Sequence, residues 1–275
     1  MSDTTPAKKG QDFEHVLDKS DRSVASFETS QRNIIERLQS ALHGNPTLVP
    51  VIVLAAAVAV FGLVAGGKFF SAFNLTLIMQ QVSIIGILAA AQSLIILTAG
   101  IDLSVAAIMV LMAVIAGNLA VYNGVPAPIA LIVAFVGGTV AGLINGFLVT
   151  KVKLPPFIST LGTWSIFFAL NLWLSGAQSI RSQDIDANAP LLKFFGQTIE
   201  MGGARITYGS ILMVLVFAVL WYMLNKTAWG RHVYAVGDDK EAAELAGIRT
   251  DRTLLSVYAL SGFVCAIAAW ASIGR

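Results

Sequence analysis

The sequence predicts an all-α, polytopic membrane protein with about seven transmembrane helices, and three observations lead to this fold class. Hydrophobic residues make up 56% of the 275-residue chain, whereas charged residues make up only 12%. Several uncharged runs reach 18 or more residues, the length that a helix needs to cross a hydrocarbon core of about 30 Å. The few Lys and Arg residues lie between these runs, where their placement indicates the orientation of the chain.

The N-terminal segment, residues 1–46, carries six basic and seven acidic residues and no apolar run. It is too long and too mixed in charge for a cleaved secretory signal, so we expect a mostly disordered cytoplasmic extension. Four apolar residues share one face of a short helix within it: Ile34, Ile35, Leu38 and Leu42. Either this helix lies on the membrane surface, or the segment is a solubilising tail with one frayed turn.

The remaining residues, 47–275, are expected to form a single transmembrane domain of seven spans. The spans are predicted at residues 48–66, 74–99, 105–121, 127–149, 157–175, 207–225 and 253–273. Glycine, proline and lysine residues separate them, as in Gly66-Gly67-Lys68 and Leu154-Pro155-Pro156. Two longer polar segments interrupt the pattern, at 177–206 and 226–252.

Charge placement predicts which side of the membrane each loop faces. If the N-terminus is cytoplasmic, Lys151, Lys153 and the five basic residues of 226–252 are cytoplasmic too. Lys68 and the loop 177–206, with three basic and three acidic residues, then lie outside. The alternation is consistent over seven spans and places Arg275 on the outer side.

No motif for covalent or metal chemistry occurs in the chain. The three histidines, His15, His43 and His232, lie outside the apolar runs, and neither His-Glu-x-x-His nor a Gly-x-x-x-x-Gly-Lys-[Ser/Thr] phosphate loop is present. We therefore expect no catalytic residue, no metal site and no cofactor in this chain. The net charge of +2 gives no reason to expect a nucleic acid partner, and the single cysteine, Cys265, is expected to be a buried, inert thiol.

Three glycines in the fourth span, Gly138, Gly142 and Gly146, follow one another at a spacing of four. This spacing puts them on one helix face, where a second helix can approach its backbone closely. We interpret this face as a helix-packing surface. Asn145 lies beside it and either bonds a neighbouring helix or lines a path.

Asp102 is the only acidic residue between Thr47 and Ala177. A carboxylate in an apolar region is costly, and it usually faces a cavity or a polar partner. One interpretation is transport chemistry. We favour the other, in which Asp102 caps or braces the start of the third span within a turn marked by Gly100 and Ser104.

Uncharged polar residues within or near the spans are candidates for a translocation path. A neutral, hydroxyl-rich solute would need such partners, although interhelical hydrogen bonds explain each residue equally well. With the two polar residues of the turn, the candidates are Gln92, Asp102, Ser104, Asn118, Asn145 and Asn171.

The segment 226–252 holds five basic and five acidic residues between two apolar runs. Asp238 is predicted as an N-cap with Glu241 three residues later, and Gly247 suits the left-handed position after the helix. The expected helix, 239–246, has only two turns and one thin face, made by Ala242, Ala243 and Ala246. So short a helix needs a surface to dock on, although an ordinary solvated loop would also fit the segment.

Four stretches resemble bacterial permeases. Glu241-Ala242-Ala243 with Gly247 resembles the Glu-Ala-Ala-x-x-x-Gly loop of permease subunits in ATP-binding-cassette importers. Residues 100–105 (Gly-Ile-Asp-Leu-Ser-Val), 154–163 (Leu-Pro-Pro-Phe-Ile-Ser-Thr-Leu-Gly-Thr) and 230–237 (Gly-Arg-His-Val-Tyr-Ala-Val-Gly) are similar to signatures of the ribose- and xylose-type sugar permeases. The likeness extends over roughly residues 70–275 and is greatest to fructose and ribose importers.

This resemblance implies a homodimeric permease of the bacterial inner membrane that imports a monosaccharide. It implies a cytoplasmic ATP-binding subunit, which would hold ATP and Mg²⁺, and a periplasmic sugar-binding protein. The coupling loop against the ATPase would contain Arg231, Asp238, Glu241, Ala242, Ala243 and Gly247. Because the family continues with further spans, the C-terminal part of the permease domain is expected to be missing here.

A secondary transporter or channel for a small neutral solute, driven by an ion gradient, is the alternative. Such proteins often carry several ionisable residues within the membrane, whereas this chain offers only Asp102 there.

Overall fold

The computed structural model describes residues 42, 44–45, 47–201 and 204–274. The chain divides into two compact units, Met1–Val64 and Ala65–Arg275. The predicted N-terminal extension, with its short surface helix, lies almost entirely outside the described residues. The first unit is represented by α3 (Leu48–Ala65), an apolar helix with no buried residue. A helix that is apolar on every side suits a lipid environment.

Seven helices in the described part of the chain are long and apolar enough to span a membrane, which confirms the predicted fold class. They are α3 with the 3₁₀ turn η2 (Gly66–Lys68), α4 (Ala72–Ile96), α5 (Val105–Gly117) with the π-helical turn η3 (Asn118–Tyr122), α6 (Ala127–Thr150), α7 (Pro156–Ser175), α9 (Tyr208–Lys226) and α12 (Thr250–Ile273). Most bounds agree with the prediction within three residues.

The end of α4 differs from the prediction by three residues, because the prediction extended this span to Ala99. The helix stops at Ile96, and Ala99 takes a left-handed conformation with φ of 56°. The amide of Gly100 donates to the carbonyl of Ile95, so the chain turns back on the last helical turn. At a helix end the left-handed position is usually occupied by glycine, but here Ala99 occupies it and Gly100 comes one residue later. The position of the glycine therefore did not indicate where the helix ends.

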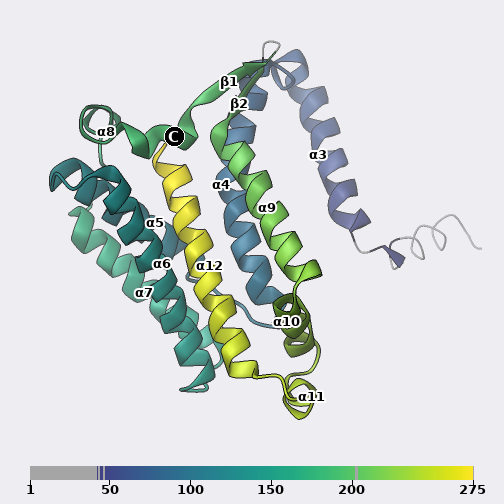
Figure 1. Cartoon of the computed structure of the whole chain (residues 1–275). Helices are drawn as coiled ribbons and strands as arrows, with labels where there is room; N and C mark the ends of the chain where they lie inside the picture. The colour runs from purple at the N-terminus through teal and green to yellow at the C-terminus, as the bar shows by residue number, and fades with distance from the viewer. Residues whose placement is uncertain (1–41, 43, 46, 202–203, 275) are drawn as a thin grey trace, which may run out of the picture. The chain divides into compact units, whose positions relative to one another are not determined.

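The second unit is built around α12, the most buried of the seven spans. α12 packs against α6, α4 and α5, while α9 packs on α4 and α7 packs on α5 (Figure 1). Leu94 of α4, Ile108 of α5 and Val257 of α12 are fully buried members of the shared core. The glycines of α6 and α12, such as Gly138 and Gly262, allow the two helices to pack closely.

The segment 177–206 is structured, although the sequence predicted only a loop. It contains α8 (Ser182–Asn188), the 3₁₀ helix η4 (Pro190–Gly196) and an antiparallel hairpin of β1 (Thr198–Met201) and β2 (Ala204–Thr207). These elements lie at one end of the bundle, called the hairpin end. The short helices α10 (Ala228–Asp238) and α11 (Lys240–Leu245) lie at the other end, called the α11 end (Figure 1). The aromatic ring of Trp270 from α12 anchors η4 by packing against Phe194 and Phe195.

Candidate functional site

The glycine face of α6 forms a backbone-to-backbone seam with α12. A Cβ atom on Gly138 would lie 2.6 Å from the carbonyl oxygen of Gly262, and one on Gly142 would lie 2.1 Å from that of Tyr258. A Cβ on Gly262 would in turn lie 2.1 Å from the carbonyl oxygen of Gly138. Gly146 continues the seam, packing against Tyr258. The seam therefore joins the two helices closely, and its partner glycine on α12 was not singled out from the sequence.

A buried polar network lies next to this seam and joins α6, α7 and the turn that leads into α5. The Asn145 side chain of α6 donates to Ser104 Oγ at 2.7 Å and to Asp102 Oδ2 at 3.4 Å. Its Oδ1 accepts from Thr163 Oγ1 of α7 at 2.7 Å. The backbone N–H and the hydroxyl of Ser104 both donate to Asp102 Oδ1 at 2.7 Å. All four side chains are buried, so their mutual bonds replace those that water would supply.

Asp102 braces the turn between α4 and α5 and does not cap α5, which corrects part of the prediction. Ser104 occupies the N-cap position, two residues further along the chain. One carboxylate oxygen of Asp102 instead accepts from the Ser104 amide, and the other accepts from Asn145 of α6. Burial raises the pKa of the Asp102 carboxyl above its usual range, and the hydrogen bonds from Ser104 and Asn145 oppose this shift.

The other path candidates lie apart from this network. Asn118 Nδ2 donates to the Leu174 carbonyl at 2.8 Å, so it ties η3 to the end of α7. Gln92 Oε1 in α4 and Asn171 Oδ1 in α7 are buried acceptors without a hydrogen-bond partner among the described residues. Asp102, Ser104 and Asn145 thus form one hydrogen-bonded cluster, to which Gln92, Asn118 and Asn171 make no hydrogen bond among the described residues.

Two short helices, α10 (Ala228–Asp238) and α11 (Lys240–Leu245), make up the α11 end. Asp239 caps α11, because its Oδ1 accepts from the amides of Glu241 and Ala242 at 2.9 and 3.0 Å. The predicted cap, Asp238, was wrong by one residue: it is the last residue of α10 and has no extended backbone with which to cap a helix. Gly247 adopts the left-handed conformation that the prediction required, with φ of 86°.

The helix α10 was not predicted from the sequence, although a signal for it was present. Trp229, Val233 and Val236 recur at positions i, i+4 and i+7, the spacing of an apolar helix face. Val233 and Val236 are buried, whereas Arg231 points away from the core and is exposed. The charges of the segment had favoured the interpretation as a polar loop.

One side of α11 packs on the bundle, and the other side is free. Ala243 is buried in a small cluster with Val236 of α10 and Leu254 of α12. Ala242 and Ala246 are exposed, so only one of the three alanines of the predicted thin face packs inward. Leu245 is 91% exposed, an unusual position for a large apolar side chain.

Polar contacts connect α11 to the adjoining ends of α12 and α6. The Thr250 hydroxyl at the start of α12 donates to Glu244 Oε1 of α11. Asp251 Oδ2 accepts from Lys151 Nζ at the end of α6 at 2.9 Å, and Lys240 Nζ of α11 lies 4.0 Å from Asp251 Oδ1. Asp251 is therefore the point at which all three helices meet.

Residues 74–273 match the family model described as branched-chain amino acid transport system / permease component. The chain belongs to this permease family. The fructose import permease of Rhizobium meliloti is 54% identical over 271 residues, which cover 98% of this chain and 75% of the relative. The ribose import permease of Bacillus subtilis is 36% identical over 201 residues, covering 73% and 60%. The D-allose transport permease of Escherichia coli is 33% identical over 223 residues, covering 81% and 66%.

These comparisons confirm the resemblance to sugar permeases of ATP-binding-cassette importers and give no support to the ion-driven alternative. They place the protein among the multi-pass membrane components of transport systems. The chain spans three quarters of the fructose permease and about 60% of the Bacillus ribose permease. No solved structure shows a significant match to the chain.

Proposed function

We propose that the protein is the membrane-spanning permease subunit of an ATP-driven importer for a monosaccharide such as fructose or ribose. Its 54% identity to a fructose import permease supports this substrate class. The permease would work as a pair of copies in the bacterial inner membrane. A cytoplasmic subunit would bind ATP and Mg²⁺ and hydrolyse the nucleotide, and a periplasmic protein would deliver the sugar.

The observation that carries this proposal is the exposed side of α11. A capped helix of six residues holds Leu245 at 91% exposure, between acidic and small neighbours. An apolar anchor on a firmly held element is typical of a protein interface, where burial of a leucine contributes about 1.5–3 kcal/mol. We assign this side to the ATP-binding subunit. The α11 end and the N-terminus are then cytoplasmic, and the hairpin end lies outside, as the charge placement predicts.

A displacement of α11 would be transmitted to the membrane spans through side-chain contacts and helix packing. Glu244 bonds Thr250 and Lys240 faces Asp251, so a displacement of α11 pulls on the start of α12. α12 carries α6 with it because their backbones touch along the glycine seam. Asn145 passes the movement on to α5 and α7 through the buried network. The partner drives the change only if it binds α11 differently in the two states.

Replacement of Leu245 by aspartate is expected to prevent the ATP-binding subunit from co-purifying with the permease and to abolish ATP-driven uptake. The change removes the apolar anchor and would bury a charge at the interface. The stability of the permease itself should change by less than about 0.5 kcal/mol, because the side chain is exposed. Co-purification from membranes that contain both subunits measures the effect.

The matched control is Leu191→Asp, which alters an exposed leucine in η4 at the opposite end of the bundle. This variant should retain the ATP-binding subunit. Equal retention by Leu245→Asp and Leu191→Asp would refute the assignment of α11 to this partner.

Replacement of Asp251 by asparagine is expected to lower the amount of sugar transported per ATP hydrolysed, by roughly threefold for an ion-pair contribution of about 0.6 kcal/mol. The change removes the negative charge that faces both Lys240 of α11 and Lys151 of α6, while the thermal stability stays nearly constant because all three side chains are partly exposed. Parallel assays of uptake and ATP hydrolysis give the ratio. Asp251→Glu keeps the charge and should preserve the ratio, and an unchanged ratio in Asp251→Asn would exclude this route of transmission.

A further inference from the structure

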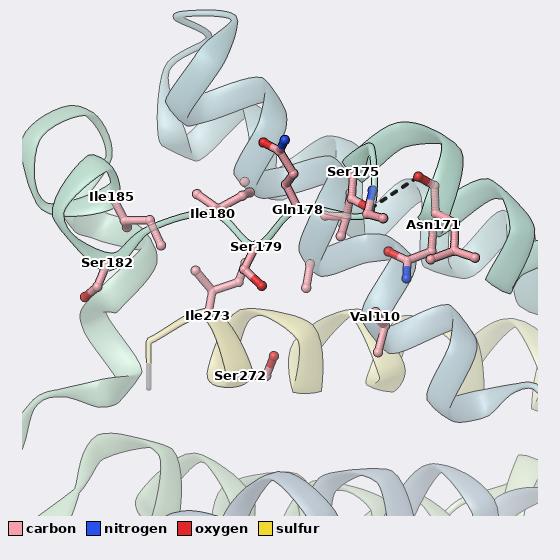
Figure 2. Close-up of a pocket in the computed structure, with 15 residues that line it drawn as sticks. Val110, Asn171, Ser175, Gln178, Ser179, Ile180, Ser182, Ile185, Ser272 and Ile273 are labelled. Atoms are coloured by element: carbon pink, nitrogen blue, oxygen red, sulfur yellow. Dashed lines mark hydrogen bonds between the residues drawn. The ribbon is translucent and has the colours of Figure 1, made fainter.

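A cavity of about 550 Å³ lies at the hairpin end of the bundle, between α5, α7 and the end of α12. The segment after α7 covers it from the side, and Figure 2 shows Asn171 and Ser175 across the space from Ile180 and Ile185. Small-molecule sites in proteins have volumes of about 300–1,000 Å³, so this cavity has the size of a ligand site.

The lining of the cavity combines neutral polar groups with an apolar wall. Its hydroxyl and amide side chains are Asn171, Ser175, Gln178, Ser179, Ser182 and Ser272. No Asp, Glu, Lys, Arg or His is among the described residues that line it, so a charged ligand would find no counter-ion. A polyhydroxylated neutral solute finds both donors and acceptors here, and aliphatic side chains such as Val110 and Ile273 can face its C–H groups.

Asn171 provides a second, independent observation. Its Oδ1 is buried yet has no hydrogen-bond partner among the described residues, although buried acceptors are nearly always paired. The residue lines the cavity, and Figure 2 places its amide beside the same space as Val110 and Ser272. The Asn171 side-chain amide at the wall of the cavity therefore has hydrogen-bonding capacity that the described residues do not use.

We propose that the cavity between α5, α7 and α12 is a binding site for the transported monosaccharide, with the Asn171 side-chain amide forming a hydrogen bond to a sugar hydroxyl. The identity of the solute rests on the proposed function, whereas the position of the site rests on the cavity and on Asn171. The cavity lies at the end of the bundle that the proposed orientation places outside. It would therefore receive the sugar before the spans rearrange.

The experiment compares the purified permease with its Asn171→Leu variant, which keeps a similar volume and removes the side-chain amide. Without sugar, the variant should unfold at the same or a higher temperature, because no protein hydrogen bond is lost. D-fructose and D-ribose are the probes, and at least one should raise the unfolding temperature of the unaltered protein. The variant should bind that sugar roughly 3- to 10-fold more weakly. Gluconate, which is charged, should bind neither protein.

The matched control is Asn188→Leu, which alters an exposed asparagine of α8 outside the cavity and should bind the sugar like the unaltered protein.

In the assembled importer, Asn171→Leu should raise the KM for uptake while the ATP-binding subunit stays associated. If the unaltered importer takes up neither sugar, the proposed function fails. If it takes up a sugar and Asn171→Leu changes neither affinity nor KM, the cavity proposal is overturned while the function stands. Lower stability of the variant without sugar would also contradict it, because Asn171 would then have a structural role.

Discussion

Replacement of Gly142 by alanine is expected to destabilise the helical bundle by about 1–3 kcal/mol, the usual cost of overpacking. The added Cβ would lie 2.1 Å from the carbonyl oxygen of Tyr258, 3.0 Å from its carbonyl carbon and 3.2 Å from the Cα of Gly262. All three atoms belong to the backbone of α12, so no side chain can move aside. Since α12 is the most buried span, its displacement disturbs every helix that packs on it. Thermal unfolding of the purified permease measures the loss.

Two glycine variants provide controls for this prediction. A Cβ on Gly162 in α7 would meet nothing within 4 Å, so Gly162→Ala should leave the protein unchanged or stabilise it by up to about 1 kcal/mol through helix propensity. A Cβ on Gly137 would meet only the flexible side chain of Met112, so Gly137→Ala should have an intermediate effect. Equal stability of Gly142→Ala and Gly162→Ala would show that α6 and α12 do not touch along this seam.

Replacement of Asn145 by leucine is expected to cost about 2–3 kcal/mol of folding stability and to reduce uptake. The change leaves Asp102 Oδ2 and Thr163 without their Asn145 partners in a buried environment. An unpaired buried polar group costs about 1–3 kcal/mol, and a charged group costs more. Loss of the link between α6 and α7 should also disturb the transmission proposed above. Thermal unfolding and uptake assays measure the two effects.

The exposed asparagine of α9, Asn225, provides the matched control. It makes a single bond to the Trp221 carbonyl, so Asn225→Leu should change stability by less than about 0.5 kcal/mol. If Asn145→Leu were as stable as Asn225→Leu, the buried network would not brace the spans.

The fold could be predicted because a membrane helix must satisfy its own backbone hydrogen bonds over a fixed length. Uncharged runs of 18 or more residues therefore gave the number of spans and most of their bounds. The end of α4 was less predictable, because Ala99 takes a left-handed conformation in which glycine is more usual. The hairpin was concealed in the polar segment 177–206, whose two strands have only four residues each.

The candidate site could be predicted where a local pattern carried it. The spacing of Gly138, Gly142 and Gly146 indicated the seam, but its partner on α12 follows from the tertiary arrangement alone. Asp102 could be selected as a candidate because a carboxylate is costly in an apolar region. Its connection to Thr163 through Asn145 depends on how the spans pack and could not be predicted. The exposure of Leu245 was equally hidden, because it depends on which side of α11 meets the bundle.

The most direct test of the central proposal uses a single new thiol at the exposed side of α11. The chain has one cysteine, Cys265, which is fully buried in α12 and therefore unreactive, so Leu245→Cys introduces the only accessible thiol in the described part. We predict that a membrane-impermeant maleimide labels this variant, produced without the ATP-binding subunit, only after cells are opened. When the subunit is present, we predict that a short thiol cross-linker joins it to the variant. Labelling of intact cells, or the absence of that subunit from the cross-linked products, would contradict the assignment of α11 as the coupling helix.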